Sequence, residues 1–150
     1  MRLKDLFGPG TVCLALTSST RDDVLRELVG LLAVDDGASD TLVKALLRRE
    51  SLGSTGVGRG IAIPHCRSAA VSKVRLAYGH HTDGLAYQAI DGLPVHDLFL
   101  IVAPPDEAVN MYLPVLGRIA QFAKDPDISA RLAGLTEPDQ FLALLDEKGV

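Results

Sequence analysis

A histidine that follows a glycine-rich loop and a proline is the feature of this sequence best suited to chemistry. Glycines recur at positions 53, 56, 58 and 60, and the apolar run 61–63 leads through Pro64 to His65. An unperturbed histidine has a pKa of about 6.5, so near pH 7 it is largely neutral and one ring nitrogen is free as a nucleophile. From residue type alone, a histidine satisfied by hydrogen bonds at the rim of a sheet is the alternative interpretation.

The loop before His65 has the composition of an anion site. Glycine lets other atoms approach its backbone closely, and successive backbone N–H groups can line a concavity for anions. The loop residues expected to bind an anion are Ser54, Thr55, Gly56, Gly58 and Arg59. The loop lacks the Lys-Ser or Lys-Thr of a Walker A motif, and a strand, not a helix, is predicted after the glycines, which argues against a dinucleotide fingerprint. A bare glycine pattern is more typical of a plain turn than of an anion site.

A phosphoryl group is an electrophile that suits such a histidine. Its transfer requires little beyond alignment and neutralisation of the phosphate oxygens. Arginines at positions 49, 59 and 67 are near in sequence and suited to that task. No carboxylate pair and no set of metal ligands accompanies the histidine, so we expect neither a metal nor another cofactor.

Other reactive groups were weighed against this interpretation. Cys66 follows His65, but neighbouring side chains on an extended backbone point opposite ways, and no C-x-x-C motif exists. His80 and His81 lack a spaced third metal ligand and are expected in a polar loop. His96 is expected at the surface. The G-x-S-x-G motif of many serine hydrolases is absent.

Hydrophobic periodicity in the first third of the chain predicts one short strand and two helices. The strand is expected near residues 12–16. Thr20 begins a capping-box-like pattern before the first helix, and Ser39 or Asp40 is expected to cap the second, which ends near residues 48–50.

The middle of the chain has short apolar runs typical of strands, at residues 60–63, 74–78 and 97–102. Pro64 removes a backbone donor, so we expect the strand before it to stop there or to lie at a sheet edge. Helices are predicted near 110–124, 127–134 and 136–147, with Thr136 as N-cap and Pro138 in the first turn. This order predicts an α/β fold, with residues 1–150 forming a single layered domain whose mixed β-sheet is flanked by helices.

Composition narrows the class of protein. The chain has 150 residues, of which 47% are hydrophobic and 23% charged, as in globular domains. The net charge is −4 and no basic stripe is present, which argues against nucleic acid and anionic membranes. No signal peptide is recognised, the apolar runs are far shorter than the ~20 residues of a membrane span, and two cysteines make no disulfide framework. We expect a cytoplasmic protein without membrane insertion.

The stretch from Arg49 to Cys66 resembles the phosphohistidine signature of EIIA components of the bacterial phosphoenolpyruvate-dependent phosphotransferase system. Among these EIIA components, the stretch is most similar to the fructose/mannitol class (type 2). The matching residues are Glu50, Val57-Gly58 and the run 61–66, and the run 49–60 is most similar to the nitrogen-regulatory branch. The resemblance continues more weakly through 89–91 and 98–104. It implies the EIIA type-2 fold and, because no EIIB or EIIC segment fits in the chain, a free-standing EIIA.

A phosphoryl relay is what the resemblance implies. Phosphorylated HPr, or its nitrogen-branch homologue, would donate to His65, and the group would pass to a cysteine of an EIIB domain or serve as a signal to a regulated target protein. Arg49 matches the family's arginine, expected to stabilise phosphate charge. The family's second histidine is matched by Tyr112, expected to contact phosphate without supplying an imidazolium charge. A regulatory binding module that keeps the fold without transferring phosphate is the alternative.

Overall fold

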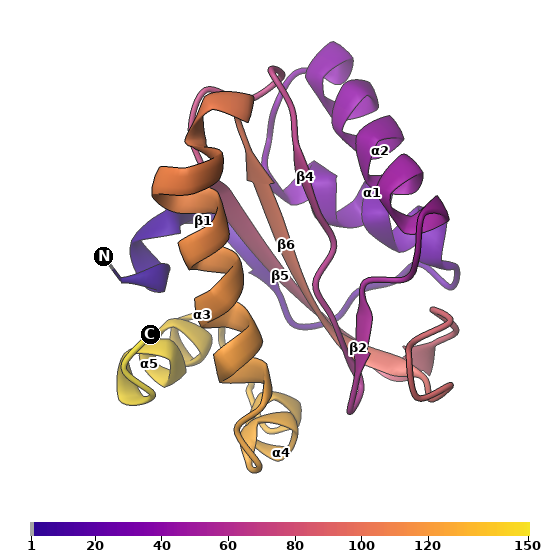
Figure 1. The fold of residues 1–150 in the computed structure, drawn as a ribbon. Coiled ribbons are helices and arrows are strands. Elements are labelled where there is room, and N and C mark those ends of the chain that lie inside the picture. The colour runs from indigo at the N-terminus through magenta and orange to yellow at the C-terminus, as the bar shows by residue number, and fades with distance from the viewer. Residues whose placement is uncertain (1) are drawn as a thin grey trace.

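A mixed β-sheet lies at the centre of the fold (Figure 1). The computed structural model describes residues 2–150, with the side chains of all of these except residues 9 and 107–109. Within this described part the sheet is six-stranded, in the order β1-β5-β6-β3-β2, with β4 also paired to β6. The strands are β1 (Phe7–Cys13), β2 (Gly56–Gly58), β3 (Ile61–Ala62), β4 (His65–Arg67), β5 (Arg75–Leu85) and β6 (Val95–Ala103).

Helices cover both faces of this sheet. Figure 1 shows α1 (Arg21–Leu31) and α2 (Asp36–Ser51) on one side, and α3 (Leu113–Ala123), α4 (Ile128–Ala133) and α5 (Pro138–Glu147) on the other. Short 3-10 helices form at η1 (Leu3–Leu6) and η2 (Pro105–Glu107), and one π-helical turn, η3 (Ala108–Tyr112), precedes α3. The predicted class, a mixed sheet flanked by helices, is confirmed.

The central strand β6 serves both layers, since alternate side chains of a strand point to opposite faces. Its side chains contribute to an α1–α2 core (Leu98, Leu100 and Val102) and to an α3–α5 core (Phe99, Ile101 and Ala103). All six are buried, which explains why this stretch of sequence is continuously apolar rather than alternating.

The helix before the glycine loop begins earlier than predicted. Asp35 is the N-cap of α2, and its carboxylate accepts from the N–H of Ala38 at 2.8 Å, so Ser39 and Asp40 lie inside the helix. Asp, Ser and Asn cap about equally well, and the pattern cannot rank several candidates in a row. Thr20 caps α1 as predicted.

Two further boundaries were wrong. Glu137, not Thr136, is the N-cap of α5 and forms a capping box with Gln140. The side-chain oxygen of Gln140 accepts from the backbone N–H groups of Thr136 and Glu137. The first strand spans residues 7–13 rather than 12–16, pairing parallel to β5 with a register shift between Phe7 and Val12.

As predicted, the strand before Pro64 stops there: β3 ends at Ala62 and β4 begins at His65, yet the register on β6 continues across the proline. Ala62 pairs with Leu98 and His65 with Ile101, so the offset between the paired residues is the same on both sides of the proline. Proline lacks a donor but keeps its acceptor, and the N–H of Ile101 donates to the Pro64 carbonyl at 3.0 Å. The proline therefore interrupts the strand without shifting its alignment on β6.

A cluster of aromatic rings joins α5 to the sheet. The ring of Phe141 stacks on Tyr78 with centroids 4.2 Å apart and meets Phe7 edge-on at 5.3 Å. It also lies 6.3 Å from the ring of Phe99. Because Phe141 is fully buried, this cluster is a large part of what holds the C-terminal helix in place.

Phe141→Ala should lower the free energy of unfolding by about 3–5 kcal/mol, because it removes a buried ring and leaves a cavity. Urea denaturation followed by circular dichroism measures the change. Leu142→Ala, at a half-buried position of the same helix, is the control and should cost less. A loss below about 1 kcal/mol for Phe141→Ala would show that α5 does not depend on this cluster.

Candidate functional site

A pocket of about 730 Å³ lies where the end of α2, strand β4 and the start of α3 meet. It is lined by Ala45, Arg48, Arg49, Leu52, His65, Cys66, Arg67, Pro105, Tyr112, Leu113 and Leu116. The pocket thus brings together three segments that are far apart in the sequence. Three of the residues predicted for the site, Arg49, His65 and Tyr112, share it.

The orientation of the His65 ring is set by one hydrogen bond. Its Nδ1 lies 2.7 Å from the carbonyl oxygen of Ile63. A carbonyl oxygen can only accept, so Nδ1 carries the proton and, in the neutral ring, Nε2 carries the lone pair. Ile63 itself packs in the α3–α5 core, whereas Cys66 packs in the α1–α2 core, as expected for alternating side chains. His65 therefore offers Nε2 as its nucleophilic atom.

Several neighbours act on the pKa of His65. Burial lowers it by disfavouring the charged ring, and the guanidinium of Arg49 lowers it further. The Ile63 carbonyl and the Glu50 carboxylate act in the opposite direction, but the net effect is a pKa below the ordinary value. The ring is therefore kept neutral, the state in which Nε2 can attack.

The charged side chains that line the pocket are all arginines. Arg49 is anchored by its own helix end, because its Nη1 donates to the carbonyl of Gly53 at 2.7 Å. Arg48 precedes it on α2, and Arg67 comes from β4, two residues beyond His65. No carboxylate is among the lining residues in the described part of the chain. Such a pocket suits an anion.

Tyr112 forms the wall opposite the helix α2. Its ring centroid lies 6.0 Å from that of His65, with the planes inclined at 54°, and the residue is 7% exposed. Burial raises the pKa of its phenol to about 12, so it remains a neutral donor. Tyr112 is the N-cap residue of α3, where helix dipoles favour negative charge.

The five loop residues predicted to bind phosphate are not among the residues that line this pocket. Gly58, Arg59 and Gly60 have φ angles of 96°, 60° and 79° and form the tight turn between β2 and β3. The Arg59 N–H donates to Asp91 at 2.9 Å, and its guanidinium donates to the carbonyl of Lys124 at 2.9 Å. The left-handed φ values explain the recurrent glycines without a ligand.

The other loop residues are bound within the fold. The carboxylate of Glu50, which is 4% exposed, accepts from the N–H of Thr55 at 3.0 Å, from the Thr55 hydroxyl, and from the Tyr87 hydroxyl at 2.7 Å. The Ser54 hydroxyl donates to the carbonyl of Tyr87 at 3.0 Å, and Gly56 lies against Ala89. Their binding of phosphate stays a prediction.

The remaining histidines have structural partners. His80 and His81 lie in β5, not in a loop, because this strand extends well beyond the apolar run from which it was predicted. Nδ1 of His80 donates to the buried carboxylate of Asp97 at 2.8 Å, and Nε2 of His81 donates to the Ser18 carbonyl at 2.7 Å. His96, predicted at the surface, is half-buried and donates from Nδ1 to the His81 carbonyl at 3.0 Å.

Cys66 is a buried thiol. Burial raises its pKa to about 12, so it stays protonated near neutral pH and is a poor nucleophile. This agrees with its interpretation as a structural residue.

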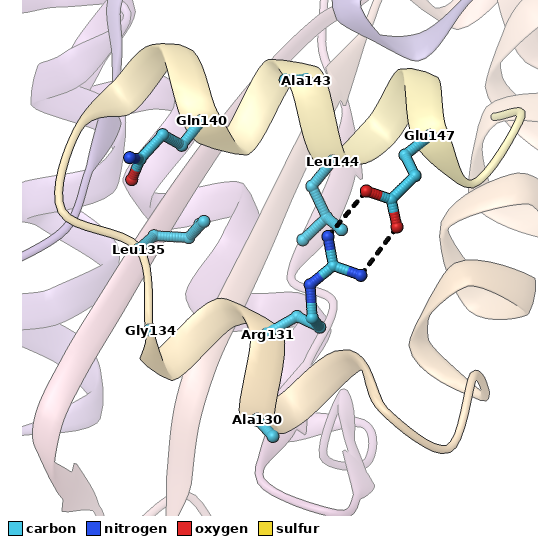
Figure 2. Close-up of a pocket in the computed structure, with 8 residues that line it drawn as sticks. All are labelled: Ala130, Arg131, Gly134, Leu135, Gln140, Ala143, Leu144 and Glu147. Atoms are coloured by element: carbon cyan, nitrogen blue, oxygen red, sulfur yellow. Dashed lines mark hydrogen bonds and ion pairs between the residues drawn. The ribbon is translucent and has the colours of Figure 1, made fainter.

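A second pocket lies between α4 and α5, shown in Figure 2. The guanidinium of Arg131 reaches across it to the carboxylate of Glu147, with N–O distances of 2.7 and 2.8 Å. Its lining contains neither histidine nor cysteine, and its arginine is already paired. It therefore lacks the groups for phosphoryl chemistry.

Two kinds of feature are absent from residues 2–150, the part of the chain that the structure describes. No helix there is long and apolar enough to span a membrane. No three or more His, Cys, Asp or Glu side chains there lie together as metal ligands would.

Relatives were found over the whole chain. The chain is 33% identical over 152 residues to the PTS system 2-O-alpha-mannosyl-D-glycerate-specific EIIABC component of Escherichia coli, covering 99% of this chain and 23% of that protein. It is 31% identical over 146 residues to the nitrogen regulatory protein of Bradyrhizobium diazoefficiens, covering 97% and 95%. The chain thus spans about a quarter of the first relative and nearly all of the second.

Solved structures share the fold. The nitrogen regulatory protein IIA-Ntr of Neisseria meningitidis superposes with a TM-score of 0.87 at 26% identity, covering 95% of this chain and 98% of that chain. The mannitol enzyme IIA of Escherichia coli, solved in complex with phosphorylated enzyme IIB, gives 0.77 at 23% identity over 95% and 99%. The family model described as "Phosphoenolpyruvate-dependent sugar phosphotransferase system, EIIA 2" matches residues 5–148. The predicted resemblance is confirmed, and the chain belongs to this EIIA 2 family.

Proposed function

We propose that this chain is a phosphoryl carrier that accepts a phosphoryl group on Nε2 of His65. The observation that carries the proposal is the hydrogen bond from Nδ1 of His65 to the Ile63 carbonyl, which leaves the Nε2 lone pair in a pocket whose charged lining residues are arginines. Nucleophile and charge stabilisers are then in place before any phosphate arrives.

The transfer step needs no proton relay. As the lone pair of Nε2 bonds to phosphorus, the bond from phosphorus to the donor's nitrogen breaks and the donor imidazole keeps that electron pair. The His65 ring gains positive charge as it becomes bonded at both nitrogens. The Nδ1–H bond to the Ile63 carbonyl becomes stronger as that charge develops, and Arg49 neutralises the phosphate oxygens.

Family membership suggests the partners. Phosphorylated HPr or its nitrogen-branch homologue is the proposed donor, and an EIIB domain or a regulated target protein is the proposed recipient. The solved complex of a mannitol enzyme IIA with its phosphorylated enzyme IIB supports the EIIB route. The nitrogen regulatory relative that matches this chain over 95% of its own length supports the regulatory route. Either role is expected in the cytoplasm.

A second candidate is a regulatory module that binds a partner without transferring phosphate onward. Tyr112 favours it, because a phenol whose pKa is raised to about 12 can donate a hydrogen bond to phosphate but brings no positive charge. The intact arrangement of Arg49 and His65 favours the carrier.

For the loop residues we propose a different role from the one predicted. Ser54 and Thr55 are bonded to Tyr87 and to the Glu50 carboxylate, and the residues at 56, 58 and 59 form the β2–β3 hairpin. They would shape the chain that leads to His65 rather than contact the phosphate.

His65→Ala should abolish phosphorylation, since it removes the accepting nitrogen. The measurement is intact-protein mass after incubation with phosphoenolpyruvate, enzyme I and HPr, or the nitrogen-branch counterparts of the latter two. The wild type should gain one acid-labile phosphoryl group, and His96→Gln, in another part of the sheet, should gain it too. No gain by the wild type with either donor system would overturn the carrier proposal in favour of the binding module.

Arg49→Gln should slow phosphorylation of His65 by about a hundredfold, because it removes a charge that stabilises the transferring group. Quench-flow or rapid sampling with phosphorylated donor measures the rate. Arg59→Gln is the matched comparison, because Arg59 was also predicted to bind phosphate but does not line the pocket, and we expect its rate to be close to that of the wild type. An equal loss for Arg59→Gln would restore its predicted role at the phosphate.

The neutral state of His65 should persist below pH 6.5. Because burial lowers its pKa, protonation of Nε2 should begin only at a pH lower than for a free histidine, and phosphorylation should decline only there. Long-range ¹H–¹⁵N spectra across pH 4–8 would show the ring protonated at Nδ1, with the signal assigned by its loss in His65→Ala. A ring protonated at Nε2, or a pKa above 6.5, would contradict the proposed geometry.

A further inference from the structure

We propose that Arg67 is a second phosphate-binding residue of this site and that the face of the Tyr112 ring positions it. The inference rests on the proposed function of His65 and adds to it a residue and a positioning contact. The sequence suggested Arg67 only by its nearness to His65, and the contact between the Arg67 guanidinium and the Tyr112 ring is seen only in the structure.

The strand places Arg67 beside the nucleophile. His65 and Arg67 are the first and last residues of β4, and they pair with Ile101 and Ala103 of β6. Residues two apart on a strand lie on the same face, so both side chains project to the side of the sheet that carries Tyr112. Both line the same pocket, and Arg67 is exposed while His65 is half-buried.

The guanidinium of Arg67 is available to a ligand. Among the described residues it makes no hydrogen bond and no ion pair, and no carboxylate lines its pocket. Arg59, by contrast, donates to the carbonyl of Lys124, and Arg49 to that of Gly53. A guanidinium has five N–H donors in a planar fork that matches phosphate oxygens. The guanidinium of Arg67, which lies beside His65, therefore has free donors for the oxygens of a phosphoryl group on that histidine.

The Tyr112 ring fixes where that guanidinium lies. The central carbon of the Arg67 guanidinium is 5.9 Å from the centroid of the Tyr112 ring, within the range of a cation–π contact. The ring is itself held in the α3–α5 core, so it offers a rigid surface to a flexible, exposed side chain. Tyr112 thus acts through its π face as a positioning residue, a role separate from that of its hydroxyl as a hydrogen-bond donor.

The two arginines would then approach the phosphoryl group from different elements. Arg49 projects from the C-terminal end of α2 and Arg67 from β4, and His65 lies with them in one pocket. A dianionic phosphoryl group on Nε2 would meet two cations there, one tied to its own helix end and one resting on an aromatic ring. This arrangement predicts that loss of Arg67 affects the phosphorylated state as well as the rate of its formation.

Arg67→Gln is the direct test, with Arg67→Lys as the conservative variant and Arg26→Gln, an exposed arginine of α1, as the control. We expect the rate of His65 phosphorylation to fall about tenfold or more in Arg67→Gln, to recover in part in Arg67→Lys, and to be unchanged in Arg26→Gln. Circular dichroism and urea denaturation confirm that each variant is folded.

A second readout reports on the phosphate itself. The ³¹P chemical shift of phosphorylated His65, followed across pH, gives the pKa of the phosphoryl oxygens. A neighbouring cation favours the dianion, so this pKa should rise in Arg67→Gln and stay near the wild-type value in Arg67→Lys. A merely structural role for Arg67 would leave it unmoved.

The ring contact is tested at Tyr112. Tyr112→Phe keeps the π face and should lose less of the phosphorylation rate than Tyr112→Leu, which should show a loss like that of Arg67→Gln. If the ring acts through Arg67, the double variant Tyr112→Leu/Arg67→Gln should be no slower than Arg67→Gln. Multiplicative losses, or a loss in Tyr112→Phe equal to that in Tyr112→Leu, would overturn the positioning role.

Failure of the proposed role of Arg67 can be distinguished from failure of the carrier function proposed for His65. A wild-type chain that is never phosphorylated would refute the carrier proposal as a whole. A wild type that is phosphorylated, together with an Arg67→Gln variant of equal rate and equal phosphate pKa, would refute only the role of Arg67.

Discussion

The pairing of residues 61–67 with β6 is the constraint on which the site depends. Its register is unchanged across Pro64, so His65 lies opposite Ile101 of β6. The proline still interrupts the pleat, and the carbonyl just before it accepts from the histidine ring. One break in this strand therefore sets both the position of the candidate nucleophile His65 and the nitrogen that it presents.

The site forms where the two helical layers meet. Helix α2 packs on one face of the sheet and α3 packs on the other. Strand β4 lies between the ends of these helices, and in the described part of the sheet it pairs with β6. Each layer contributes one wall: arginines from the end of α2, and an aromatic ring from the start of α3. At the rim, Leu52 is 81% and Leu113 56% exposed, so the walls of this pocket end in apolar side chains open to solvent.

The charge of the pocket differs from the net charge of the chain, because its arginines face the pocket while the neighbouring glutamate is buried. The chain as a whole carries −4, yet the ionised groups that line the pocket are arginines. Arg49 and Glu50 are adjacent in sequence, but α2 turns the arginine toward the pocket and the glutamate into the interior, where Thr55 and Tyr87 satisfy its carboxylate. A buried carboxylate with three donors holds the loop without neutralising the arginines that an anion needs.

The class of fold, the EIIA resemblance and the candidate nucleophile could be predicted from the sequence, since the periodicities of 2 and 3.6 and the run from Arg49 to Cys66 are local patterns. The sequence did not separate the residues that surround His65 from those that only precede it. The glycine loop suggested an anion site, but its positive φ angles serve a hairpin turn, and Arg59 is bonded to the carbonyl of Lys124 far along the chain. The contacts of Tyr112 with His65 and with Arg67 became visible only in the folded chain, because they join β4 to the start of α3. No local periodicity encodes a contact between elements so far apart in the sequence.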